Sequence, residues 1–67
     1  MEFGKILRLK RESKGFTQEE VARRLGISKQ NICSFEKGYK IPSLMIAVAA
    51  ADLFGCSMDE MIGRSST

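Results

Sequence analysis

The sequence contains no histidine and no tryptophan, and it has only one proline and two cysteines among its 67 residues. The absence of histidine removes the commonest acid–base residue and metal ligand. Cys33 and Cys56 lie 23 positions apart and form no Cys-x-x-Cys pair, so we expect no zinc site. No glycine-rich phosphate loop, catalytic triad or carboxylate cluster is visible either. These absences predict that the chain is not an enzyme, that it holds no metal or cofactor, and that it has no evident small-molecule site.

Long hydrophobic runs and strand patterns are also missing. No apolar run reaches the roughly 18 residues of a membrane span, no signal-peptide layout is present, and no segment alternates with period two for long. A chain of 67 residues has room for one small core. We therefore expect a soluble, cytoplasmic, all-α domain over residues 1–63, followed by a short frayed tail at residues 64–67. Dimerisation is an expected further source of stability for so small a domain.

Charge is distributed unevenly along the chain. Residues 1–42 contain ten Lys or Arg and five Asp or Glu, a net charge of +5, whereas residues 43–67 contain one Arg and three acids, a net charge of −2, and these sum to +3. A basic front half and an acidic back half indicate one surface for a polyanion and another turned away from it. On charge alone, an ordinarily solvated surface is an equal alternative.

Residues 17–38 have the pattern of two short helices joined by a tight turn. Thr17 followed by Glu20 predicts a capping box at the start of the first helix. Gly26 predicts a left-handed residue just past its end, and Ser28 predicts the N-terminal cap of the second helix. The apolar residues are spaced so that the two helices face each other: Val21, Ala22, Leu25, Ile32 and Phe35. This pattern is typical of a helix-turn-helix, whose second helix (the reading helix) offers polar side chains to the major groove of DNA.

The sequence resembles the DNA-binding domain of the lambda-type phage repressor and Cro family, whose members are also called xenobiotic-response-element-type regulators. The resemblance extends over residues 3–62, and its matching residues are TQEEVA at 17–22, LGIS at 25–28, Ile32, FEKG at 35–38, PSL at 42–44 and FGCSMDEMI at 54–62. It implies a compact five-helix fold in which the second and third helices form the helix-turn-helix. It also implies a homodimer that binds double-stranded DNA.

The resemblance and the geometry of the groove assign candidate DNA-contacting residues. The first turn of a reading helix reaches the base edges, so base contacts are expected from Lys29, Gln30 and Asn31, and from Ser34 one turn later. Glutamine or asparagine can bond adenine through two hydrogen bonds, whereas lysine favours the acceptors of guanine. Phosphate contacts are expected from residues at helix starts and in the loop after the reading helix, namely Gln18, Ser28, Lys37, Tyr39 and Lys40. The alternative for each base-contacting candidate is an ordinary solvated surface position. For Tyr39 the alternative is packing on Pro42, which does not exclude a phosphate contact.

An ion pair is expected between Arg11 and Glu36. By resemblance, Arg11 occupies the position of an arginine that pairs with a glutamate near the end of the reading helix. The pair would tie the helix predicted over residues 2–14 to the reading helix and fix its angle. The alternative is two separate surface charges, which would add little stability.

The helix predicted over residues 44–54 is apolar on nearly every side, because Asp52 is its only charged residue. By resemblance its core positions are Leu44, Ala47, Val48, Ala51 and Phe54. Met45 and Ile46 fall on the face where many relatives have polar residues. We therefore expect an additional partner contact at Met45 or Ile46, and the alternative is that the first and fifth helices cover them.

The short helix predicted over residues 58–62 has more apolar residues than it can bury alone. In the family this region packs on its copy in a dimer, and flexible methionines suit an adaptable interface. The resemblance therefore implies a dimer interface that consists of Cys56, Met58, Met61 and Ile62.

These observations predict a sequence-specific transcriptional regulator, a homodimeric repressor that binds a pseudo-palindromic operator through the major groove. One alternative is a transcriptional activator, such as a restriction–modification controller protein. Another is a protein-interaction adaptor that uses the same fold, although the basic front half and the polar reading helix favour DNA.

Overall fold

The structure, a computed structural model, describes residues 2–64, and between them it contains five helices and no strand. The helices are α1 (Phe3–Ser13), α2 (Gln18–Leu25), α3 (Lys29–Glu36), α4 (Leu44–Phe54) and α5 (Met58–Met61). The predicted all-α, five-helix class is therefore confirmed. Of the tail expected at residues 64–67, only Arg64 lies within the described residues.

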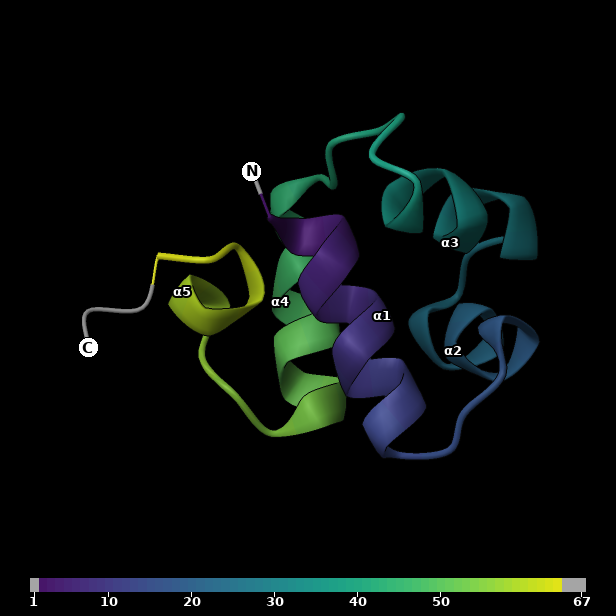
Figure 1. Cartoon of the computed structure of the whole chain (residues 1–67), viewed down its shortest axis with the longest axis horizontal. Coiled ribbons are helices and arrows are strands. Elements are labelled where there is room, and N and C mark those ends of the chain that lie inside the picture. Colours follow the sequence, from purple (N-terminus) through teal and green to yellow (C-terminus); the bar gives the residue numbers. More distant parts are fainter. Residues whose placement is uncertain (1, 65–67) are drawn as a thin grey trace.

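The helices are arranged around α1 and α4, which occupy the middle of the domain (Figure 1). The α2–α3 pair lies on one side of them and α5 on the other. α1 contacts α3, α4 and α5, and α2 contacts α3 and α4. The helix-turn-helix is thus held against the rest of the fold through both of its helices.

Four of the five helices begin at a hydroxyl residue whose side chain accepts a backbone N–H. At α2, Thr17 Oγ1 accepts the N–H of Glu20 at 3.1 Å, and Glu20 Oε1 accepts the N–H of Thr17 at 2.8 Å, which completes the predicted capping box. The remaining three caps each accept the N–H three residues on, and they are Ser28, Ser43 and Ser57. Such a cap stabilises a helix by about 1 kcal/mol, so these helix starts are determined locally.

The hydrophobic core takes side chains from all five helices. It consists of Phe3, Leu7, Val21, Ala22, Ile32, Phe35, Ala47, Ala50, Ala51, Phe54 and Met61. The rings of Phe3 and Phe35 meet edge to face, with their centroids 5.5 Å apart. This aromatic contact joins the start of α1 to the buried side of α3, so the core itself helps to orient α3.

The buried face of α4 differs from the predicted one. Ala47, Ala50, Ala51 and Phe54 are buried, whereas Leu44 is 68% exposed and Val48 is 41% exposed, so the core positions expected at 44 and 48 were wrong. With 3.6 residues per turn, Val48 lies at the flank of this alanine-rich stripe. Small alanine side chains let the neighbouring helices approach α4 closely along the stripe.

No helix between residues 2 and 64 has both the length and the apolar character that crossing a bilayer requires.

Candidate nucleic-acid interface

The turn between α2 and α3 is fixed by one glycine and one backbone hydrogen bond. Gly26 has φ 71°, in the left-handed region that favours glycine, and it ends α2 as predicted. The N–H of Ile27 donates to the carbonyl of Ala22 at 2.9 Å. Ala22 is buried, and its small side chain leaves room for α3 to pack across α2. The angle between α2 and α3 is therefore set by this backbone turn and by the small side chain of Ala22.

α3 has one buried face and one polar face. Ile32 is fully buried and Phe35 is 3% exposed, which anchors the helix in the core. The residues predicted to contact bases lie outside this buried stripe: Lys29 and Gln30 are exposed, and Asn31 and Ser34 are half-buried. With 3.6 residues per turn, Gln30 and Ser34 lie opposite the stripe, and Lys29 and Asn31 lie on its two flanks.

The Arg11 side chain forms a hydrogen-bonded ion pair with Glu36 that joins α1 to the end of α3. Arg11 Nε and Nη2 donate to the two carboxylate oxygens of Glu36 at 2.7 and 3.1 Å. The two side chains are only 13% and 5% exposed. The hydrogen bond to Glu36 raises the pKa of Arg11 above its already high ordinary value. The arrangement is a bidentate, charge-assisted contact shielded from solvent.

Two further hydrogen bonds extend this ion pair into a three-helix network. Arg11 Nη1 donates to the carbonyl of Phe16 at 2.9 Å, just before α2. Gln18 Nε2 donates to Glu36 Oε1 at 3.0 Å. Among residues 2–64, every buried side-chain nitrogen and oxygen has a hydrogen-bond partner. The network connects α1, α2 and α3, and it leaves Gln18 one amide N–H for the phosphate contact expected of it.

Lys40 lies against α3 rather than extending freely from the loop. Its ammonium donates to Asn31 Oδ1 at 2.6 Å and lies 5.9 Å from the centre of the Phe35 ring. From the sequence, Lys40 is expected at phosphate and Asn31 at bases, with no link between them. Nothing in the pattern of residues signals a contact between a loop lysine and a helix residue nine positions earlier.

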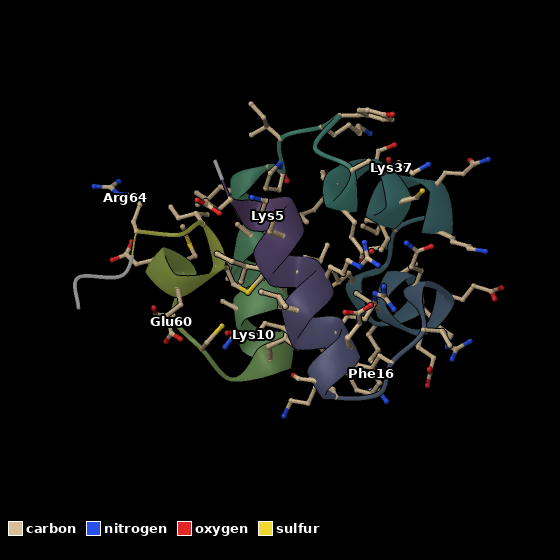
Figure 2. All side chains as sticks on the ribbon, in the orientation of Figure 1. Lys5, Lys10, Phe16, Lys37, Glu60 and Arg64 are labelled. Atoms are coloured by element: carbon tan, nitrogen blue, oxygen red, sulfur yellow. The ribbon has the colours of Figure 1, made fainter. Side chains whose placement is uncertain are left out.

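The other residues expected at phosphates are on the surface beside α3. Lys37 follows the end of α3 and is exposed (Figure 2). Tyr39 is 77% exposed, so most of its side chain is accessible to a partner. The Ser28 hydroxyl oxygen accepts the N–H of Asn31 at 3.2 Å, which leaves its own O–H free to donate.

Gly4 is a positioning residue that the sequence analysis did not identify. A Cβ atom added at Gly4 would lie 1.9 Å from the carbonyl oxygen of Phe35. α1 and α3 therefore approach so closely that only glycine fits between them. Together with Arg11, this contact fixes the end of α3 against α1.

The residues expected at a dimer interface are mostly engaged within the domain. Met61 is fully buried, so the expectation that it forms an interface is corrected: it fills the space where α5 packs on α1 and α4. Cys56, Met58 and Ile62 are half-buried and pack against the same core. Lys10 Nζ lies 3.8 Å from Glu60 Oε2, and this ion pair joins α1 to α5 in addition to their apolar packing (Figure 2).

An additional contact was expected at Met45 or Ile46, and the two residues differ in their exposure. Ile46 is half-buried and packs against the core, which agrees with the covered alternative. Met45 is 82% exposed and lies opposite the buried stripe of α4. The apolar residues exposed near the start of α4 are Ile41, Leu44 and Met45.

Comparison with known proteins gives consistent matches. A family model described as helix-turn-helix matches residues 7–61. The chain is 31% identical over 64 residues to the HTH-type transcriptional regulator ImmR of Bacillus subtilis (strain 168), covering 96% of this chain and 50% of ImmR. It is 41% identical over 59 residues to the uncharacterized HTH-type transcriptional regulator YazB of the same organism, covering 88% of this chain and 86% of YazB.

A third relative, the HTH-type transcriptional regulator AnsR of Bacillus subtilis (strain 168), is 39% identical over 54 residues, covering 81% of this chain and 47% of AnsR. The chain thus spans about half the length of ImmR and of AnsR.

Proposed function

Because the chain belongs to the Cro/C1-type helix-turn-helix family of DNA-binding regulators, we propose that it is a sequence-specific transcriptional repressor. It acts as a homodimer on a pseudo-palindromic operator, in the cytoplasm. It is not an enzyme, since the family is a DNA-binding family and its relatives are named as transcriptional regulators. Occupation of an operator by such a dimer blocks transcription by excluding the polymerase.

The observation that carries this proposal is the division of α3 into two faces. Ile32 and Phe35 are buried, and Glu36 is bonded to Arg11, so the helix cannot rotate without breaking the core and the ion pair. The amide, ammonium and hydroxyl groups outside the buried stripe are then held in fixed positions on the solvent side of α3. Those groups match the donors and acceptors at base edges in the major groove.

Phosphate contacts supply the affinity. Lys37 and Tyr39 are exposed beside α3, and the N-terminus of α2 presents Gln18 and free backbone N–H groups to an anion. Contacts of this kind set register on the duplex without reading sequence. They also make binding fall as salt concentration rises.

A dimer is supported by the size of the domain and by its exposed apolar residues. The described chain measures 31 × 23 × 18 Å, so two copies side by side can place their α3 helices about 34 Å apart, the spacing of successive major grooves. We propose that the interface includes the half-buried side chains of Cys56, Met58 and Ile62. Exposed Leu44 and Met45 are further candidates for it.

The test is selection of bound duplexes from a random pool, followed by affinity measurements on the selected operator. The proposal expects one inverted-repeat consensus, a steep salt dependence, and a dimer in analytical ultracentrifugation of the complex. Gln30→Ala should weaken binding to the selected operator by about 5- to 150-fold while circular dichroism stays unchanged. Asp52→Asn, an exposed change on α4, is the control and should bind normally. A folded protein that selects no consensus would refute the proposal.

The activator alternative is favoured by one observation, the exposure of Met45 at 82% on the face of α4 away from the core. Such a side chain suits contact with a second protein, such as RNA polymerase or the partner of an adaptor. Transcription in vitro from a template with the selected operator separates the alternatives. Repression by the wild-type chain supports the repressor, whereas stimulation that Met45→Ala abolishes while operator binding is retained supports the activator.

A further inference from the structure

The contact between Lys40 and Asn31 changes what the reading helix can recognise. Lys40 Nζ donates to Asn31 Oδ1 at 2.6 Å, and the same ammonium lies 5.9 Å from the centre of the Phe35 ring. We propose that Asn31 and Lys40 together form a donor-only pair that selects guanine, and that Lys40 thereby sets the base preference at the position that Asn31 faces. The inference rests on the proposed function, because it requires α3 to enter the major groove.

A free asparagine side chain favours adenine. Adenine presents the N7 acceptor and the N6 amino donor in the major groove, and an asparagine amide matches both with its N–H and its oxygen. The match needs the amide oxygen to accept from the base. Asn31 lacks that free oxygen, since Oδ1 already accepts from the Lys40 ammonium.

The second lone pair of Oδ1 does not restore the adenine match. A charge-assisted hydrogen bond at 2.6 Å places a full positive charge directly beside that oxygen. The amino group of adenine has its positive end directed outward, so it would approach a cation. The pair therefore disfavours adenine at this position.

The groups that remain free on the pair are all donors. Asn31 retains its two amide N–H groups, and Lys40 retains two of its three ammonium N–H groups. Guanine presents two acceptors, O6 and N7, at its major-groove edge. One donor from each residue satisfies both acceptors, so guanine is the base that the pair matches.

The structure holds each member of the Lys40–Asn31 pair by a separate contact. The ammonium is near the Phe35 ring, and Phe35 is itself 3% exposed and fixed in the core. The backbone N–H of Asn31 is held by the Ser28 hydroxyl at 3.2 Å. The pair is thus presented by a buried ring and a helix cap, which distinguishes Lys40 from a lysine that only attracts phosphate.

The experiment compares duplexes selected from a random pool by the full chain and by four variants, each checked for folding by circular dichroism. Asn31→Ala identifies the base pair that residue 31 reads, because preference should vanish there. In Lys40→Met the oxygen of Asn31 is released, so guanine at that base pair should give way to adenine, with a change in relative affinity of about 5- to 150-fold. Lys40→Arg keeps the donors and should keep guanine.

Lys37→Met is the matched control for the loss of charge. Lys37 is exposed next to the end of α3 and is also a candidate phosphate contact. Its removal should weaken binding to all duplexes and reduce the salt slope by about one, with the wild-type consensus unchanged. A change of consensus in Lys40→Met alone therefore reports on Asn31 and not on electrostatics.

Several outcomes would overturn the inference. One is a Lys40→Met consensus identical to that of the wild type with uniformly weaker binding, which would make Lys40 only a phosphate contact. Another is adenine as the wild-type base at the position that Asn31→Ala identifies. A folded wild-type chain that selects no consensus would instead refute the proposed function, and the inference would fall with it.

Discussion

The network around Glu36 gives the sharpest test of how the reading helix is held. Glu36→Ala removes two of the three hydrogen-bond acceptors of Arg11 and the acceptor of Gln18. Because the Arg11 side chain is 13% exposed, its charge would remain largely buried without an opposite charge, with only the Phe16 carbonyl as an acceptor. Breaking a buried pair in this way costs about 3–5 kcal/mol. The variant should therefore be severely destabilised.

That loss is large on the scale of this domain. A chain of 67 residues has a total stability of about 3–10 kcal/mol. At 4–8 °C per kcal/mol for a domain of this size, the expected fall in Tm is roughly 12–40 °C. The assay is urea denaturation and thermal melting followed by circular dichroism.

The chain provides a matched control in the exposed pair Arg8–Glu12, whose side chains are 63% and 52% exposed at a distance of 3.3 Å. Glu12→Ala also removes a carboxylate that faces an arginine, yet it should lower the free energy of unfolding by less than about 1 kcal/mol. If Glu36→Ala and Glu12→Ala have the same effect on stability, the reasoning about the network is refuted.

A double variant tests whether the cost comes from the unpaired charge. Arg11→Met with Glu36→Leu replaces the ion pair by apolar side chains, and it should recover much of the stability that Glu36→Ala loses. Affinity for the selected operator should recover less, because Gln18 loses the partner that positions it. Full recovery of both quantities would show that the ion pair has no role in orienting α3.

Three further predictions concern single side chains. Gly4→Ala should lower the free energy of unfolding in urea by about 1–3 kcal/mol, although alanine is the better helix former, because its Cβ would meet an α3 carbonyl at 1.9 Å; unchanged or higher stability would contradict this close packing. Met61→Ala should lower the free energy of unfolding by about 2–5 kcal/mol, because Met61 is fully buried. Met45→Ala should lower it by less than about 0.5 kcal/mol, because Met45 is 82% exposed. Equal losses of stability in urea would contradict the observed burial. The hydrogen bond from the Thr17 backbone lowers the pKa of Glu20 below its ordinary value of 4.5, so the ionised carboxylate stabilises the fold above that pH and loses this effect as pH falls through the folded-state value; acid melts of Glu20→Gln should therefore show a smaller loss of stability on acidification than the wild type.

Local patterns made most of the fold predictable from the sequence. The residues that cap α2, α3, α4 and α5 act within three positions of themselves, so their effect does not depend on the rest of the chain. Gly26 ends α2 for an equally local reason. The Arg11–Glu36 contact spans 25 positions, and it could be expected only from the resemblance to a known family.

The features that were missed depend on how the helices pack. α4 is apolar on nearly every side, so hydropathy alone does not determine which stripe is buried. Leu44 and Val48 were assigned to the core by resemblance to the family, and they are exposed. Met61 was expected at an interface because a short helix could not hide it alone, but α1 and α4 cover it. The role of Gly4 depends on the distance between two backbones that no sequence pattern encodes.

In the proposed function the buried and the polar residues of α3 have separate tasks, and this separation has an evolutionary consequence. Ile32 and Phe35 keep the domain folded, whereas Lys29 and Gln30 can be exchanged at little cost to folding, so new operators are within reach of a few surface substitutions. Residue 31 is the exception, because its amide is shared with a loop outside the helix. If Asn31 and Lys40 select guanine together as proposed, descendants that change their target at that position would have to alter residues 31 and 40 as a pair, and grafting α3 alone into another scaffold would transfer its specificity incompletely.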